Sequence, residues 1–155
     1  MMTNLSCDVL KALAGKTLAT AESCTGGGIG AALTAIPGSS HVYQGGVISY
    51  TNEVKENVLK VDGNLLQKYG AVSYQTAQAM AEGVRSLLKA DVAVSVTGLA
   101  GPGSDGTDTP VGTVFIGYCD DKKAYAKEYR FSGSREDVRN QAIESALMLI
   151  LAENN

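Results

Sequence analysis

The sequence predicts a single α/β domain, a three-layer α/β/α sandwich around a mixed β-sheet. Helix-type and strand-type hydrophobic patterns alternate along the chain and one hairpin pattern comes late, which is typical of a mixed sheet covered by helices. Two glycine-rich turns each follow a strand-type run. The 155 residues, 45% of them apolar, match one compact core. We therefore expect residues 1–155 to form one domain.

The first half of the chain shows four helical patterns and two strand patterns. Leu5, Val9 and Leu13 recur at helical spacing, and Gly15 follows as a stop, which predicts a helix over residues 4–13. Residues 17–20 form a short β-prone run, and a helical pattern follows the glycines at 26–28 and ends near residue 36. A second strand is expected over 42–51, then short helices from residue 52 and over 62–69.

The second half begins with a long amphipathic helix. Ser73 is a suitable N-cap for this helix over 74–89, and the apolar run at 91–96 fits a strand buried on both faces. Residues 97–110 are rich in Gly, Pro, Ser, Asp and Thr and predict a loop, and loops of this length are often functional. Strands over 111–118 and 123–131 form a hairpin. Ser134 opens a last helix with Asp137 at the capping-box position.

Composition narrows the functional classes. The net charge is −3 without any basic run, so we expect no nucleic-acid partner. No apolar run reaches the roughly 20 residues of a membrane span, and the N-terminus lacks the pattern of a secretory signal, so we expect a cytoplasmic protein. The three cysteines are widely spaced and are expected to be free thiols. His41 is the only histidine, which rules out a histidine-based metal cluster.

The segment Glu22-Ser23-Cys24-Thr25-Gly26-Gly27-Gly28 lies where a strand gives way to a helix. Its backbone amides can face a ligand at the positive end of the helix dipole and stabilise an anion or a developing oxyanion. Alternatively, the glycines only let the chain turn. The segment matches neither the Walker pattern nor GxGxxG.

Two further segments are expected near this turn. Residues 97–103 again follow a predicted strand and are rich in glycine, and residues 50–55 follow another. Ligands of α/β sheets gather beyond the carboxyl ends of parallel strands, so these segments are expected to meet, although a purely structural loop at 97–103 is an alternative. Lys55 near a helix start opposes the helix dipole, so it either extends into solvent or serves a purpose.

A nucleophilic serine without a histidine partner needs another base. A partly desolvated lysine with a lowered pKa can act as one, which makes Ser23 and Lys55 a candidate catalytic pair. Cys24 is the rival nucleophile, although a neighbouring cysteine is more often a buried filler. Arg135 and Arg139 share one face of the last helix and either clamp a phosphate or carboxylate or belong to a solvated face.

Five ordered blocks of the sequence resemble the CinA C-terminal domain family, which includes stand-alone nicotinamide-nucleotide amidohydrolases. The blocks lie at residues 21–27, 45–55, 70–73, 96–102 and 110–114. The resemblance implies hydrolysis of the carboxamide of nicotinamide mononucleotide to nicotinic acid mononucleotide and ammonia, in pyridine-nucleotide salvage. It implies no metal or organic cofactor.

The resemblance also implies roles for individual residues. Ser23 would be the nucleophile and Lys55 its base, Tyr50 and Thr97 would line the site, and Arg139 would meet the phosphate. Gly26 and Gly27 would offer backbone donors, and the substrate-binding set is completed by Thr25, Gly98 and Gly101.

The chain departs from the family pattern at residues 103–109, which puts the substrate fit of that loop in question. It is also expected to lack the large N-terminal domain of full-length CinA proteins and any pyrophosphatase activity of that domain. The alternative to an amidase is a non-catalytic nucleotide-binding module related to competence and damage-inducible proteins. A symmetric dimer is the expected assembly.

Overall fold

The structure is a computed structural model and describes residues 2–155. The strands are β1 (Leu18–Glu22), β2 (Tyr43–Ile48), β3 (Val92–Gly98), β4 (Thr113–Cys119) and β5 (Ala124–Arg130). The helices are α1 (Met2–Ala12), α2 (Gly28–Thr34), α3 (Asn52–Asn57), α4 (Gly63–Tyr69), α5 (Tyr74–Leu88) and α6 (Arg135–Asn154), with a 3-10 turn η1 (Ser39–His41). The predicted alternation of helices and strands is confirmed.

The five strands form one mixed sheet in the order β2-β1-β3-β4-β5. β1 pairs in parallel with both β2 and β3, and Glu22 lies opposite Ile48 on one side and Val96 on the other. The pairings of β3 with β4 and of β4 with β5 are antiparallel. The carboxyl ends of the three parallel strands therefore meet at one edge of the sheet, where α/β proteins gather their ligands.

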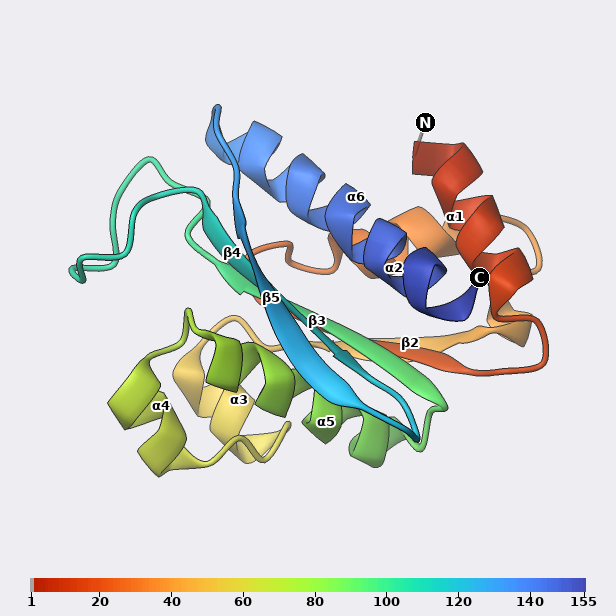
Figure 1. Cartoon of the computed structure of the whole chain (residues 1–155), viewed down its shortest axis with the longest axis horizontal. Helices are drawn as coiled ribbons and strands as arrows, with labels where there is room; N and C mark the ends of the chain where they lie inside the picture. Colours follow the sequence, from red (N-terminus) through yellow and green to blue (C-terminus); the bar gives the residue numbers. More distant parts are fainter. Residues whose placement is uncertain (1) are drawn as a thin grey trace.

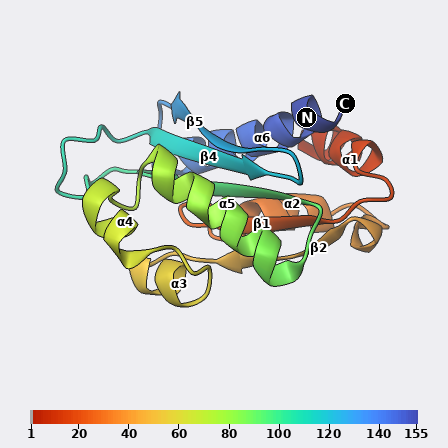
Figure 2. The same ribbon diagram turned by 60° about the horizontal axis from the view of Figure 1, so that its bottom comes forward.

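Helices cover both faces of the sheet and complete the predicted three layers. α1, α2 and α6 lie on one face, and α3, α4 and α5 lie on the other (Figures 1 and 2). The larger core cluster lies between the sheet and helices α1, α2 and α6. It includes Leu33, Ile116 and Leu147, none of which is exposed. Full burial of a side chain of this size contributes about 1.5–3 kcal/mol.

Four helices begin at residues whose side chains accept a backbone N–H. Thr51, Asp62, Ser73 and Ser134 are the N-caps of α3, α4, α5 and α6. The capping box predicted from Ser134 and Asp137 is confirmed, because each side chain accepts the backbone N–H of the other residue. Such caps contribute about 1 kcal/mol each and fix where the helix starts.

Two strand ends differ from the sequence prediction in a way that shapes the site. β1 continues to Glu22, so that Ser23 is the first residue beyond the strand, and β2 ends at Ile48 and not at Thr51. The carbonyl groups of Ser49 and Tyr50 accept the Lys55 side chain, and Thr51 is the N-cap of α3. A side-chain contact between residues five and six positions apart thus accompanies the early end of β2, and hydrophobic periodicity cannot show such a contact.

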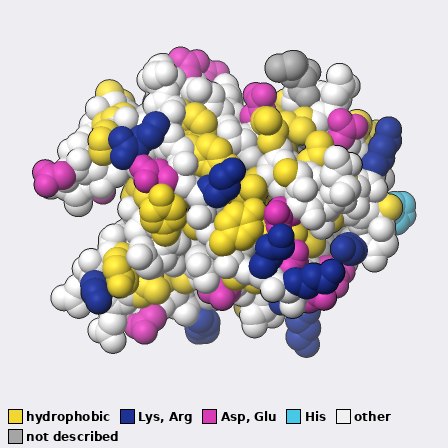
Figure 3. All heavy atoms as spheres, viewed as in Figure 1, with side chains coloured by type: hydrophobic (Ala, Val, Ile, Leu, Met, Phe, Trp, Pro, Cys, Tyr) yellow, Lys and Arg dark blue, Asp and Glu magenta, His cyan; other side chains and the backbone are white. Residues whose placement is uncertain are grey.

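Charged side chains of both signs are interspersed on the face shown in Figure 3. Among residues 2–155, no helix has the combined length and hydropathy needed to cross a bilayer.

Gly117 of β4 lies where α5 packs closely against the sheet. A Cβ at this position would overlap the Ala77 carbonyl oxygen and lie 2.5 Å from Ser95 Oγ. We therefore expect Gly117→Ala to lower the free energy of unfolding by about 1–3 kcal/mol in a denaturant titration. Gly103→Ala adds a methyl group with nothing within 4 Å and should change stability by less than about 0.5 kcal/mol. Equal effects of the two substitutions would contradict the tight packing of α5.

Candidate active site

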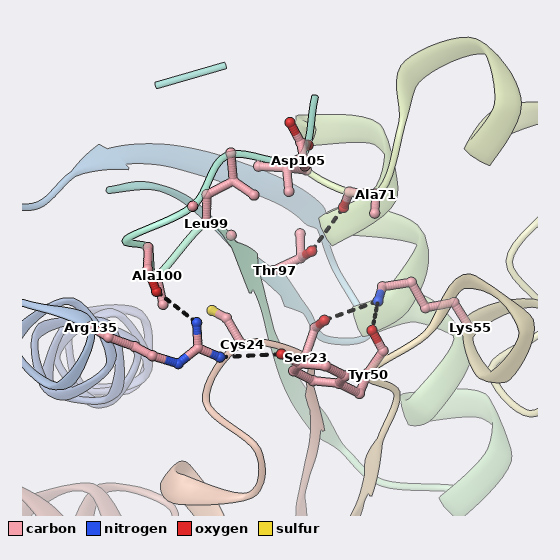
Figure 4. A pocket seen from close by; sticks show the side chains of 14 residues that line it. Ser23, Cys24, Tyr50, Lys55, Ala71, Thr97, Leu99, Ala100, Asp105 and Arg135 are labelled. Atoms are coloured by element: carbon pink, nitrogen blue, oxygen red, sulfur yellow. Dashed lines mark hydrogen bonds between the residues drawn. The ribbon is translucent and has the colours of Figure 1, made fainter. Parts of the chain in front are cut away.

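A pocket of about 250 Å³ opens at the carboxyl ends of the parallel strands. Its wall includes Ser23 after β1, Tyr50 after β2, and Thr97 at the end of β3 (Figure 4). The loop after β3 and the first turn of α6 contribute Gly101 and Arg135. The three segments that the sequence analysis placed together do meet.

Ser23 occupies a fixed position at the floor of this pocket. Its backbone N–H donates to the Val96 carbonyl oxygen at 2.9 Å, which ties the turn after β1 to strand β3. The residue is buried, and its Oγ accepts a hydrogen bond from Lys55 Nζ at 3.0 Å. The pair proposed from the sequence is therefore in contact across 32 positions of the chain.

Lys55 is only 1% exposed, so its extension into solvent is excluded. It is the fourth residue of the six-residue helix α3, and its Nζ also donates to the carbonyl oxygens of Ser49 at 2.6 Å and Tyr50 at 3.4 Å. The structure records ion pairs between other residues only. Burial without a counter-charge lowers the pKa of Lys55 to about 8, which leaves a useful fraction of neutral amine at neutral pH.

Cys24 also reaches the pocket wall, but its environment disfavours a nucleophilic thiolate. The residue is buried, and burial raises the pKa of its thiol to about 11. A thiol with such a pKa is almost wholly protonated near neutral pH and is a weak nucleophile. Lys55 Nζ forms its hydrogen bond with Ser23 Oγ and not with the Cys24 thiol.

Arg135 forms the wall opposite Lys55. Its Nη1 donates to the Gly101 carbonyl oxygen at 2.8 Å, and its Nη2 donates to Tyr50 Oη at 3.2 Å. These bonds join α6, the loop after β3 and the end of β2 around the pocket (Figure 4). The guanidinium has no carboxylate partner among residues 2–155, so its charge is available to an anion.

The segment after β3 gives the pocket a wall with few side-chain donors. Thr97 Oγ1 donates to the Ala71 carbonyl oxygen at 2.8 Å, which holds the connection between α4 and α5 against the pocket. Gly98 and Gly101 line the wall next to it. Asp105 reaches the rim, and a hydrogen bond from the Thr107 hydroxyl keeps the pKa of its carboxyl below the usual value.

Four of the expected substrate-binding residues lie behind the pocket wall and hold the turn that carries Ser23. Thr25 is fully buried, and its Oγ1 donates to Glu22 Oε1. The Gly26 N–H donates to the Ser23 carbonyl oxygen, and Gly26 and Gly27 both have positive φ angles, 60° and 102°. Arg139 gives its Nε to the Cys24 carbonyl oxygen and its Nη2 to that of Thr25.

The sequence reasoning gave no role to several groups of the site. The apolar wall residues Ala71, Val72, Leu99 and Ala100 carry no chemical signal, and the Ser49 carbonyl is a backbone group that any residue could provide. Glu22 is an acidic residue beside the serine, but the predicted strand ends at residue 20, so the sequence does not indicate that Glu22 is buried in β1. His41 lies before β2, at the edge of the sheet opposite the pocket.

Among residues 2–155, His, Cys, Asp and Glu side chains form no group of three or more that could hold an ion.

Comparisons with known proteins agree with this architecture. The sequence profile of the CinA C-terminal domain family matches residues 2–153. A CinA-like protein of Thermotoga neapolitana is 47% identical over 133 residues, which are 85% of this chain and 32% of that protein. The chain spans about a third of the length of the curated relatives it matches.

Solved structures match over nearly the whole chain. A CinA superfamily protein from Klebsiella pneumoniae superimposes with a TM-score of 0.96 at 35% identity, covering 99% of this chain and 97% of the other. The competence/damage inducible protein CihA from Agrobacterium tumefaciens gives a TM-score of 0.95 at 37% identity, covering 99% and 96%.

The buried amine of Lys55 should make stability depend on pH. Its pKa is about 8 in the folded protein and 10.5 for a free side chain, so the unfolded chain binds the proton more tightly. Stability should therefore rise as the pH increases from 8 towards 10.5. Between pH 7 and 10 we expect the wild type to gain on the order of 2 kcal/mol relative to Lys55→Met, measured by denaturant titration.

Lys68→Met, at an exposed position of α4, corrects for the loss of one lysine charge. A constant difference in unfolding free energy between wild type and Lys55→Met over this pH range would show that Lys55 is not desolvated.

Proposed function

Because this chain belongs to the CinA C-terminal domain family, we propose that it is an amidohydrolase that converts nicotinamide mononucleotide to nicotinic acid mononucleotide and ammonia. The observation that carries this proposal is the 3.0 Å contact between Ser23 Oγ and the buried Nζ of Lys55. A serine hydroxyl paired with an amine of lowered pKa is the arrangement that activates serine when no histidine is near.

Acylation would begin with neutral Lys55. Its Nζ accepts the Ser23 proton while Oγ attacks the carboxamide carbon, and a tetrahedral intermediate forms. Lys55 then returns the proton to the amide nitrogen. The C–N bond breaks, ammonia leaves, and the nicotinoyl group remains on Ser23 as an ester.

In deacylation, Lys55 would act as the base again, with water as the nucleophile and Ser23 as the leaving group. Lys55 accepts a proton from water as the water oxygen attacks the ester carbon, and the proton returns to Ser23 Oγ as the C–O bond breaks. The products are the carboxylic acid and free serine. The Cys24 N–H, next to Ser23 in the chain, donates to no backbone carbonyl among residues 2–155, and we propose it as a donor to the oxyanion.

Arg135 is the group that we assign to the phosphate. Neither arginine has a carboxylate partner among residues 2–155, but Arg135 lines the pocket, whereas Arg139 lies outside the lining and donates to two backbone carbonyls of the turn. A guanidinium presents several donors in a plane and suits a phosphate better than an ammonium does. The pocket would thus hold the carboxamide between Ser23 and Lys55 and the anionic end beside Arg135.

If Ser23 and Lys55 act together, replacing either residue should cause a similar loss of activity. Ser23→Ala and Lys55→Arg should each lower ammonia release from nicotinamide mononucleotide by about a hundredfold or more, since a guanidinium keeps the charge but cannot accept the serine proton. Wild-type kcat/KM should rise with pH through about 8 as Lys55 becomes neutral. The double variant Ser23→Ala/Lys55→Ala should be scarcely worse than either single change.

Cys24→Ala is the matched control for this series and should keep most of the turnover. If Ser23→Ala stays active while Cys24→Ala does not, the thiol is the nucleophile. Nucleotide binding by the wild type without any ammonia release would instead favour a non-catalytic binding module.

Removing the proposed contact between Arg135 and the phosphate should mainly raise KM. Arg135→Ala should raise KM for nicotinamide mononucleotide several-fold or more and change kcat less, because a contact remote from the amide acts nearly equally in ground and transition states. The nucleoside that lacks the phosphate should show no such change. Arg130→Ala removes an arginine from β5, outside the pocket, and serves as the charge-matched control. A rise in KM for Arg139→Ala but not for Arg135→Ala would return the phosphate to Arg139.

A further inference from the structure

Glu22 is a buried ionisable group that the chemistry above does not use. It is the last residue of β1 and directly precedes Ser23, yet it is only 2% exposed. Its carboxylate forms no ion pair with any residue from 2 to 155. A buried carboxylate without a counter-ion persists only when hydrogen-bond donors replace the water that it loses.

Four donors surround this carboxylate. Oε1 accepts from Thr25 Oγ1 at 2.7 Å and from the Ile29 N–H at 2.8 Å. Oε2 accepts from the Gly30 N–H at 3.0 Å and from Thr20 Oγ1 at 3.2 Å. One side chain therefore connects the end of β1, the turn after Ser23 and the first turn of α2.

These bonds replace the cap that α2 lacks. The N-cap of α2 is Gly27, which provides no side-chain hydrogen bond, and the helix has only seven residues. Free N–H groups at a buried helix start require acceptors, and Glu22 provides them from across the turn. The position of α2 relative to β1 is thus set by the residue adjacent to the nucleophile.

Arg139 holds the same turn from its other side. It binds the carbonyl oxygens of Cys24 and Thr25 at 3.0 and 3.1 Å, while Glu22 binds the hydroxyl of Thr25. The turn of residues 23–27 is therefore fixed between a buried anion and a cation. A displacement of this turn would move Ser23 Oγ relative to Lys55 Nζ, which is held by carbonyl groups after β2 and not by the Glu22 carboxylate.

We propose that Glu22 is a positioning residue for the proposed amidase reaction, and that its carboxylate fixes the turn so that Ser23 Oγ lies within reach of Lys55. It does not touch the substrate, so its removal should slow chemistry without weakening binding. A small displacement of a reacting group can cost a factor of ten to a hundred in rate.

The test compares Glu22→Gln with Asp62→Ala. Glutamine retains one acceptor oxygen, but its amide nitrogen opposes the donors that face Oε2. Asp62→Ala removes the carboxylate cap of α4, another seven-residue helix, on the other face of the sheet. We expect Glu22→Gln to lower kcat about tenfold or more with KM within about twofold. Asp62→Ala should leave both constants unchanged.

A second readout reports on Ser23 without the amide substrate. A small alkyl fluorophosphonate forms a P–O bond to Ser23 and releases fluoride, while the serine proton passes to Lys55. Glu22→Gln should slow this labelling by the same factor as kcat. The folded fraction of each variant is measured by circular dichroism at the assay temperature, because partial unfolding alone would lower both rates by one factor.

If Glu22→Gln does not fold, Thr25→Val removes only the 2.7 Å donor and keeps the carboxylate. It should lower kcat and the labelling rate in parallel, with KM unchanged. A raised KM with unchanged labelling would make Thr25 a substrate contact and overturn the inference.

The outcomes separate this inference from the proposed function. Wild-type rates in Glu22→Gln, or equal losses in Asp62→Ala, would overturn the positioning role and leave the amidase in place. Labelling of Ser23 that depends on Glu22, without any ammonia release by the wild type, would support the positioning role and contradict the amidase. A wild type that is never labelled at Ser23 would count against both.

Discussion

The site depends on a lysine that is buried without an anion. Had a carboxylate lain beside Lys55, the attraction would have kept the amine protonated, and Ser23 would have had a neighbour that could only donate. Instead, the Nζ contacts carbonyl oxygens after β2 and the serine hydroxyl. Carbonyl dipoles hold the amine in place, and they stabilise its charged form less than a full negative charge would. The loss of hydration therefore outweighs the stabilisation by the carbonyl groups, and the pKa of Lys55 falls to about 8.

That environment requires two segments of the chain to be held at fixed positions. Lys55 belongs to α3, which Thr51 caps directly after β2, whereas Ser23 belongs to the turn between β1 and α2. Parallel pairing of β1 with β2 brings the two segments to the same edge of the sheet. The pairing sets their positions to within a residue, and the side chains around the turn set the remaining orientation. The glycines at 26 and 27 provide the left-handed backbone that this turn needs.

Much of this could be predicted from the sequence because it is local. Hydrophobic periodicity and caps such as Ser134 gave the order of the elements, and glycine-rich turns after strands indicated the edge where the site lies. The early end of β2, the burial of Lys55 and the four donors around Glu22 depend on specific side-chain hydrogen bonds, which hydrophobic periodicity does not show. The same limit applies to the arginines. Their four-residue spacing showed a shared face, but only the packing of α6 separates Arg135 at the pocket from Arg139 at the turn.

The division between these arginines bears on how an acidic protein could bind an anionic substrate. The chain carries a net charge of −3, yet Lys55 and Arg135 line the pocket with only the rim residue Asp105 as an acidic neighbour. Glu22 directly precedes Ser23 in the sequence, but its carboxylate accepts four hydrogen bonds and lies beneath the turn of residues 23–27. A neutral Lys55 would leave Arg135 as the principal charge facing a bound anion. Proton transfer and anion binding can then be served by two different basic residues. The lowered pKa of Lys55 does not weaken the binding of the anion by Arg135.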